Sequence, residues 1–114
     1  MSNKFYARKT PCNQNHMHAS MKEAQRCNDL HILLRKGEIE ALEIEPQFWF
    51  VIDGVQVKHA NGRRAGFKPD FRYRENGRCI VEDVKGGKAT RTEAFNLRWA
   101  LARTLWPQFE WRLV

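Results

Sequence analysis

The sequence predicts a single α+β domain arranged in three layers, with helices flanking a mixed sheet. Helical periodicity occurs twice, in one segment that begins near residue 20 and in another near residue 90. Segments rich in aromatic and β-branched residues, separated by turn dipeptides, lie between these helices and after the second. The resulting order of helix, several strands, helix and strand is typical of α+β or three-layer folds. With 114 residues the chain can bury one modest core.

The first helix is predicted from Met21 to about Lys36. Ser20 can cap its start, and Glu23 at the third helical position completes a capping box. Gly37 is a typical stop after the last turn. The expected buried face consists of apolar residues at helical spacing: Ala24, Cys27, Leu30, Leu33 and Leu34.

The first strand is predicted from Leu42 to Ile52. Pro46 within it indicates an edge strand or a break, because proline has no N–H group for a ladder hydrogen bond. Asp53-Gly54 is a turn signal that predicts a hairpin with a short returning strand from Val55 to His59. Asn61-Gly62 marks a further turn.

Two further strands are predicted around a second hairpin. They extend from Phe67 to Arg74 and from Arg78 to Lys85, and Asn76-Gly77 between them is a strong hairpin turn. Gly86-Gly87 is expected to end the second of these strands.

The second helix is predicted from Thr90 to Leu105, and Pro107 stops it. Its expected buried stripe is Ala94, Leu97, Leu101 and Leu105, widened by Phe95, Trp99 and Trp106. An apolar band this broad predicts burial on more than one side. A last strand is predicted from Phe109 to Val114. The tryptophans Trp49, Trp99, Trp106 and Trp111 are all expected in the core.

Composition favours an intracellular protein with a polyanionic partner. The net charge of +7 indicates nucleic acid as the commonest such partner. No apolar run approaches the roughly 20 residues of a membrane span, and Met1 to Lys9 is polar and basic, unlike a secretory signal. An odd number of cysteines, without an export signal, argues against a disulfide framework. We therefore expect a cytoplasmic location and no contact with a membrane.

The most informative pattern is Asp70 followed by Asp83-Val84-Lys85. Alternate side chains of a strand share a face, so Asp83 and Lys85 point the same way and Val84 points into the opposite layer. Asp70 is expected to lie near Asp83, because both are at comparable distances from the intervening hairpin turn. Two carboxylates and a lysine at one place suit metal-assisted hydrolysis of phosphodiesters. The alternative is a surface hairpin with ordinary ion pairs.

These residues also carry a resemblance to a known family. Pro69-Asp70 followed by Asp83-x-Lys85 resembles the motif of the PD-(D/E)XK nuclease superfamily. More closely, the chain resembles a family of small proteins encoded by tailed phages and prophages, similar to phage Holliday junction resolvases. The segments that carry it are Ser20-Met21-Lys22-Glu23-Ala24, Lys36-Gly37-Glu38-Ile39, Pro46-Gln47-Phe48, Lys68-Pro69-Asp70-Phe71 and Val81-Glu82-Asp83-Val84-Lys85-Gly86.

The resemblance implies a restriction-endonuclease-like core with the order αβββαβ. It also implies a divalent metal, Mg²⁺ or Mn²⁺, and cleavage of DNA, in particular of branched DNA, within a bacterial host cell. A resolvase makes two symmetric cuts, so a C₂ homodimer is expected with that activity.

Two glutamates complete or compete for this site. In many such nucleases a glutamate of the first helix joins the metal ligands, and Glu23 matches that position; the alternative is that Glu23 only caps the helix. Glu82 would replace Asp83 if the strand register were shifted by one residue. The spacing to Lys85 favours Asp83.

A second cluster of metal-binding residue types lies near the N-terminus. Cys12, His16, His18 and Cys27 are a zinc-type ligand set, although their spacing fits no common zinc finger. A structural zinc would staple the irregular segment 1–19 to the domain of residues 20–114. Alternatively, Cys27 is a core residue and the histidines are exposed. Cys79 is expected to be buried in a strand.

Basic residues flank the acidic pattern on both sides. We expect phosphate contacts from Arg63, Arg64, Lys68, Lys88 and Arg91. One rival to the endonuclease is a non-enzymatic nucleic-acid-binding module with a structural zinc. A second is a phage accessory protein that binds another protein through its basic face.

Overall fold

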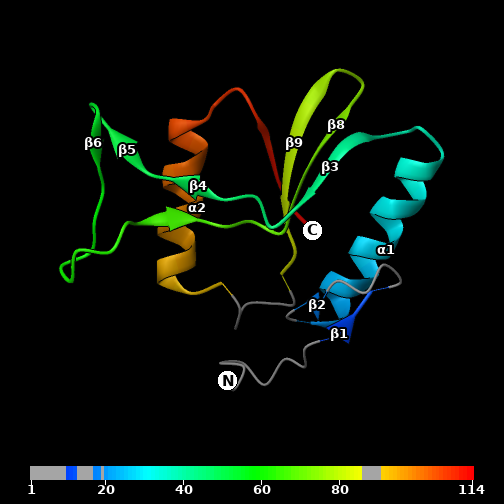
Figure 1. The fold of residues 1–114 in the computed structure, drawn as a ribbon, viewed down its shortest axis with the longest axis horizontal. Coiled ribbons are helices and arrows are strands. Elements are labelled where there is room, and N and C mark those ends of the chain that lie inside the picture. The colour runs from blue at the N-terminus through cyan, green and yellow to red at the C-terminus, as the bar shows by residue number, and fades with distance from the viewer. Residues whose placement is uncertain (1–9, 13–16, 19, 86–90) are drawn as a thin grey trace.

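The computed structural model describes residues 10–12, 17–18, 20–85 and 91–114, with residues 17 and 18 described for the backbone only. Helices α1 (Met21–Arg35) and α2 (Glu93–Leu105) lie on opposite sides of a central sheet (Figure 1). Each helix packs on its own hydrophobic cluster against the sheet. The α+β class and the helix–sheet–helix layering predicted from the sequence are therefore confirmed.

The central sheet has four strands in the order β10-β9-β8-β3. Strands β3 (Glu40–Ile44), β8 (Phe71–Glu75) and β9 (Arg78–Asp83) pair antiparallel, and β10 (Glu110–Leu113) pairs parallel to β9. The sheet is mixed, as predicted. Strand β9 is internal, with a neighbour on each side.

The first helix begins and ends where its capping residues predict. Ser20 Oγ accepts a hydrogen bond from the backbone N–H of Glu23 at 3.2 Å. At the other end Gly37 has a φ of 75°, and Glu38 N–H donates to Leu33 O at 3.0 Å. Together with a hydrogen bond from Gly37 N–H to Leu34 O at 3.1 Å, this bond forms a Schellman motif, which requires a left-handed residue and therefore favours glycine.

Two small elements precede α1. Strands β1 (Thr10–Pro11) and β2 (Met17–His18) pair antiparallel, and both contact α1. Part of the segment expected to be irregular is thus paired and lies against the first helix.

Residues 45–70 form a projection that we call the arm. Its base is closed by a hydrogen bond from Glu45 N–H to Asp70 O at 2.8 Å. The arm extends past α2, on the side away from α1 (Figure 1). It contains two short antiparallel pairs, β4 (Phe48–Trp49) with β7 (Gly66–Phe67) and β5 (Val51–Ile52) with β6 (Val55–Gln56).

The arm corrects two predicted strands. The predicted strand from Leu42 to Ile52 is interrupted after Ile44, and Pro46 lies in the break, as its missing N–H predicted. The predicted strand from Phe67 to Arg74 is wrong as a single element. Phe67 pairs with β4 of the arm, whereas Phe71 pairs with β3 of the sheet, so the chain changes partner around Pro69.

Helix α2 also differs from the prediction. It begins at Glu93, where Thr92 Oγ1 accepts a hydrogen bond from Phe95 N–H at 3.1 Å; the predicted first residue, Thr90, lies outside the described residues. The predicted buried stripe is wrong at Ala94, which is exposed, and at Leu97, which is 69% exposed, whereas Leu101 and Leu105 are partly buried against the cluster as predicted. The fully packed residues are Phe95, Trp99 and Ala102, which face the sheet and the arm.

The remaining strand ends differ by a few residues. Strand β9 stops at Asp83 rather than Lys85, and β6 covers only the first two residues of the predicted Val55–His59 strand.

Neither described helix is both long and apolar enough to cross a membrane.

Candidate active site

The β8–β9 hairpin brings the first two acidic residues together. Asn76 and Gly77 both have positive φ, 53° and 76°, as a type I′ turn requires. This turn sets the register in which Phe71 pairs with Glu82, and Asp70 N–H donates to Glu82 O at 3.1 Å. Asp70 therefore lies beside Asp83, as its distance from the turn predicted.

Asp83 and Lys85 lie on the same side of the chain. Lys85 Nζ is 2.9 Å from Asp83 Oδ2 and 3.7 Å from the centre of the Phe95 ring on α2. Val84 packs instead on the cluster beneath α1, while its N–H donates to Asp70 Oδ2 at 2.7 Å. The alternation predicted for this segment is confirmed.

Helix α1 contributes a third carboxylate. Glu23 is buried in the first turn of α1, and its negative charge is one of the causes that raise the pKa of Asp70. The cap of the helix uses the backbone N–H of Glu23. Glu23 therefore serves the helix start through its backbone N–H, and its side chain lies near the acidic pair.

Burial and mutual repulsion dominate the electrostatics of these carboxyls. Burial, followed by the charges of Asp83 and Glu23, raises the pKa of Asp70 to about 9. Burial also raises the pKa of Asp83, although the Lys85 ammonium acts in the opposite direction. Like charges that are buried near one another disfavour simultaneous ionisation, so the group favours a bound proton or cation.

The donor set suits a hard divalent cation. Mg²⁺ prefers carboxylate oxygens, and Asp83 Oδ2 is a buried oxygen that lies 2.9 Å from the Lys85 ammonium. In this structure no three His, Cys, Asp or Glu side chains of the described residues are arranged to hold a metal ion. Lys85 and the Val84 N–H instead contact the oxygens that would face a cation.

The end of β9 is fixed from two directions. Lys85 N–H donates to Val114 O, and Val114 N–H donates to Asp83 O, both at 3.0 Å, which extends the pairing with β10 past Asp83. From α1, Lys22 Nζ donates to Lys85 O at 2.7 Å. The backbone around Lys85 is therefore held although β9 has formally ended.

Glu82, which would replace Asp83 in a register shifted by one residue, is bound by other side chains. Glu82 is fully buried on the α1 side of β9, where Arg26 donates to both of its carboxylate oxygens, at 2.9 and 2.6 Å. The hydroxyl of Tyr73 donates to the same carboxylate. The sequence analysis did not predict these roles of Arg26 and Tyr73. A signal was present, because Arg26 is a basic residue beside the inward stripe of the first helix, and such a residue indicates a buried acidic partner.

Comparison with known proteins gives one family. A family described as "Protein of unknown function (DUF1064)" matches residues 2–112. The chain belongs to this family. No curated protein and no solved structure matches it.

The cysteine and histidine cluster of this DUF1064 chain is described in part. Cys12 and Cys27 are both buried, and burial followed by a hydrogen bond with Cys12 raises the pKa of Cys27 to about 12. His16 and the side chain of His18 lie outside the described residues. A histidine not predicted for this cluster, His31, has its Nδ1 3.6 Å from Cys27 Sγ.

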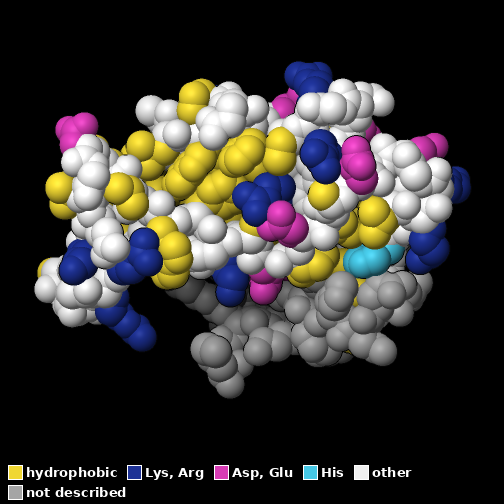
Figure 2. All heavy atoms as spheres, turned by 45° about the horizontal axis from the view of Figure 1, so that its top comes forward, with side chains coloured by type: hydrophobic (Ala, Val, Ile, Leu, Met, Phe, Trp, Pro, Cys, Tyr) yellow, Lys and Arg dark blue, Asp and Glu magenta, His cyan; other side chains and the backbone are white. Residues whose placement is uncertain are grey.

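The basic residues predicted to contact DNA are dispersed over the DUF1064 chain. Arg63 and Arg64 lie near the end of the arm, where Lys and Arg side chains gather (Figure 2). Lys68 lies near the base of the arm, 4.0 Å from Glu45. Arg91 is exposed just before α2, and Lys88 lies outside the described residues.

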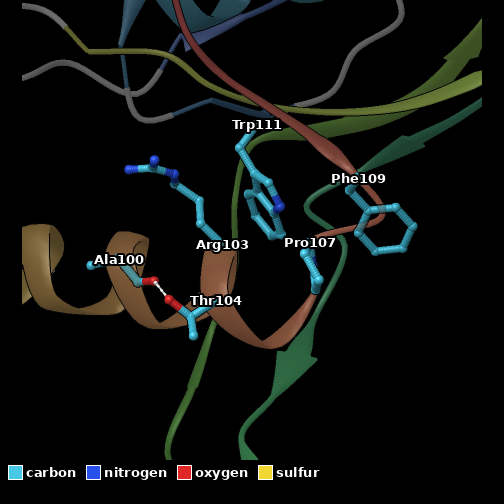
Figure 3. Close-up of a pocket in the computed structure, with 6 residues that line it drawn as sticks. All are labelled: Ala100, Arg103, Thr104, Pro107, Phe109 and Trp111. Carbon is cyan, nitrogen blue, oxygen red and sulfur yellow. Dashed lines mark hydrogen bonds between the residues drawn. The ribbon is translucent and has the colours of Figure 1, made fainter.

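A hollow of about 490 Å³ lies where α2 ends and β10 begins (Figure 3). No carboxylate lines it, and the hydroxyl of Thr104 is used within the helix, donating to Ala100 O at 2.9 Å. It is therefore separate from the acidic site. Its lining residues are Ala100, Arg103, Thr104, Pro107, Phe109 and Trp111.

Proposed function

We propose that this protein is a metal-dependent endodeoxyribonuclease that hydrolyses phosphodiester bonds. The observation that carries the proposal is the largely buried pair of Asp70 and Asp83 beside Lys85, with the buried Glu23 near enough for its charge to act on Asp70. A cluster that raises the pKa of Asp70 to about 9 favours the binding of a cation. Perturbed carboxyls of this kind are typical of functional sites.

The roles follow from the positions of the side chains. Asp70, Asp83 and Glu23 would hold Mg²⁺ or Mn²⁺, and the metal would activate water and offset charge on the phosphate. Lys85 lies next to Asp83, where its ammonium can stabilise the charge that develops on the phosphate or orient the attacking water. The ring of Phe95 covers this ammonium and holds it at the site.

The topology supports a restriction-endonuclease-like core. Apart from the arm and the β1–β2 pair, the elements follow the order α1, β3, β8, β9, α2 and β10. This is the αβββαβ order that the resemblance to PD-(D/E)XK nucleases implies. In this order the acidic residues lie on the central hairpin and at the start of the first helix.

The preferred substrate in this proposal is branched DNA such as a Holliday junction. Reading bases commonly requires a helix or a β-ribbon in the major groove. Both helices are packed on the sheet, and the outward side of α2 includes the apolar Leu97, which is 69% exposed, among its polar side chains. Contacts to phosphates remain, and these distinguish DNA by its geometry. A junction-cleaving enzyme would act as a C₂ dimer.

A second candidate function is a non-enzymatic nucleic-acid-binding module with a structural zinc. The close approach of the buried Cys12 and Cys27 favours it, since thiolates are preferred zinc ligands. In that function the three carboxylates would have no role in catalysis.

One experiment separates the two functions. Four-way, flap, nicked and linear DNA of matched sequence are incubated with the protein in Mg²⁺, in Mn²⁺ and in EDTA. The proposed enzyme cleaves only with a divalent metal and cleaves the four-way junction faster than its linear arms. Binding without cleavage under every condition would establish the binding module. Equal rates on all substrates would establish a nuclease without structural preference.

A further inference from the structure

The arm has an exposed tryptophan where the sequence predicted a buried one. Trp49 is 41% exposed, whereas Trp99, Trp106 and Trp111 pack in the cluster between α2 and the sheet. The position of Trp49 is fixed, because it pairs across the arm with Gly66. A Cβ atom added to Gly66 would lie 2.9 Å from Cε3 of the indole, so the ring occupies the space that a side chain would fill.

Arg64 completes a stack on this tryptophan. Its guanidinium carbon lies 4.6 Å from the centre of the indole ring, within the range of a cation–π contact. Beside the stack is a hollow of about 730 Å³, lined by Trp49, His59, Asn61, Arg63 and Arg64. None of these five residues is acidic.

The loop that lines the hollow is ordered by its own hydrogen bonds. His59 N–H donates to Arg63 O at 2.8 Å, and Arg63 N–H donates to the Asn61 side chain at 3.0 Å. Such a loop presents its side chains with little further loss of conformational entropy on binding.

Arg63 and Arg64, near the end of the arm, differ in their ion pairing from the basic residues of the sheet. On the sheet, basic side chains are paired with acidic ones, as in Arg72–Glu43 at 2.5 Å and Arg78–Glu110 at 2.6 Å. No carboxylate pairs with Arg63 or Arg64 within the described parts of the chain. Unneutralised guanidinium groups around an exposed aromatic ring indicate an anionic ligand with a flat apolar group.

We propose that the hollow beside Trp49 binds an unpaired nucleotide of the DNA, with the base taking the place of the Arg64 guanidinium on the indole and with Arg63 and the displaced Arg64 holding the phosphates. This inference rests on the proposed function in taking DNA as the substrate. A tryptophan ring can stack on a base only where that base is not already stacked in a duplex. Branch points and single-stranded flaps supply such bases, so the arm selects DNA that contains them.

The test measures binding by the full-length protein in EDTA, where metal-dependent cleavage cannot occur. The probes are a short oligothymidylate and a blunt duplex of the same length, and the signal is quenching of tryptophan fluorescence together with anisotropy of a labelled probe. We expect the oligothymidylate to bind more tightly than the duplex. Trp49→Phe should retain most of the affinity, whereas Trp49→Leu, which keeps apolar bulk without a π face, should weaken binding roughly tenfold.

A matched pair tests the charges. Arg64→Ala should weaken binding and lower the slope of log affinity against log salt by about one, whereas Arg35→Ala, an equal loss of charge at the end of α1, should leave both unchanged. Equal affinity of Trp49→Leu and Trp49→Phe, or equal binding of duplex and single strand, would overturn the inference. Failure of the proposed function would look different, since cleavage would be absent while oligothymidylate binding stayed dependent on Trp49.

Discussion

Arg26 on α1 and Glu82 on β9 form an ion pair joined by two hydrogen bonds, with the carboxylate 0% exposed. Arg26 lies one turn after Glu23, and Glu82 directly precedes Asp83. The pair therefore links the helix and the strand that carry two of the three acidic residues of the candidate site. It lies on the α1 side of β9 and leaves Asp83 free to face the site.

Breaking this pair should destabilise the protein. Glu82→Gln leaves Arg26 charged and partly buried, and removing one partner of a buried pair commonly costs about 3 kcal/mol. The measurement is chemical unfolding followed by circular dichroism. The matched control is Glu40→Gln, which breaks an exposed contact with Arg74 at 3.7 Å and should cost less than about 1 kcal/mol. Equal costs for the two variants would contradict the prediction.

Asp83→Asn and Lys85→Ala should each abolish cleavage and leave the fold and DNA binding largely intact. Asp83→Asn removes the charge of a proposed metal ligand, and Lys85→Ala removes the ammonium beside it. The measurement is cleavage of a four-way junction in Mg²⁺, with Lys36→Ala at the exposed end of α1 as a control for loss of a positive charge. Near-wild-type cleavage by either site variant would refute the assignment.

Glu23→Gln should lower cleavage strongly while costing little stability. The substitution keeps the shape of the side chain and the backbone N–H that Ser20 caps, but it removes one negative charge from the site. Cleavage rate and free energy of unfolding are measured on the same preparation. A loss of about 1 kcal/mol with unchanged cleavage would show that the residue serves only the helix start.

Without metal, the protein should become less stable as the pH rises. The carboxyl of Asp70 has a pKa of about 9 when folded and an ordinary value of 3.8. The folded chain therefore binds more protons between these values, and the free energy of unfolding falls as the pH rises from about 4 to about 9. Thermal unfolding in EDTA across this range measures the effect.

Two changes should weaken this pH dependence. Asp70→Asn removes the titrating group but leaves an oxygen that can still accept from Val84 N–H. Mg²⁺ should raise the unfolding temperature more at high pH than at low pH, since the metal competes with a proton. A wild-type stability that rises between pH 5 and 8 in EDTA would contradict the assignment of a raised pKa to Asp70.

Purified protein should contain about one zinc ion per chain. The prediction rests on the four residues of the N-terminal cluster, two of which, Cys12 and Cys27, are buried close together. Elemental analysis after purification without chelator gives the content. Cys27→Ser should remove the zinc, and Cys79→Ser on β9 should not. Absence of zinc from the wild type would favour a purely hydrophobic role for Cys27.

Local signals in the sequence predicted the elements that have clear boundaries. Ser20 and Gly37 define α1, and Asn76-Gly77 sets the register that brings Asp70 to Asp83. In each case the conformation depends on a cap or a turn within a few residues. The same holds for the break at Pro46, which follows from a missing backbone donor.

The features that were missed depend on contacts between distant segments. The strand across Pro69 failed because its two halves pair with different partners. The stripe failed at Ala94 and Leu97 because the arm leaves an open hollow beside them, and periodicity alone does not show how much of a broad apolar band is covered. The Arg26–Glu82 pair joins residues 56 positions apart.

The strands of the sheet differ greatly in the length of chain that each pairing must close. The β8–β9 hairpin needs only the turn at Asn76 and Gly77, whereas β3–β8 pairing closes the whole arm and β9–β10 pairing closes over α2. Because long-range pairing is kinetically slow, the hairpin should form first, with Asp70 and Asp83 adjacent but still hydrated. Docking of the remaining elements then buries these carboxylates and strengthens their repulsion, so a divalent cation held as proposed should speed that late step more than the early one.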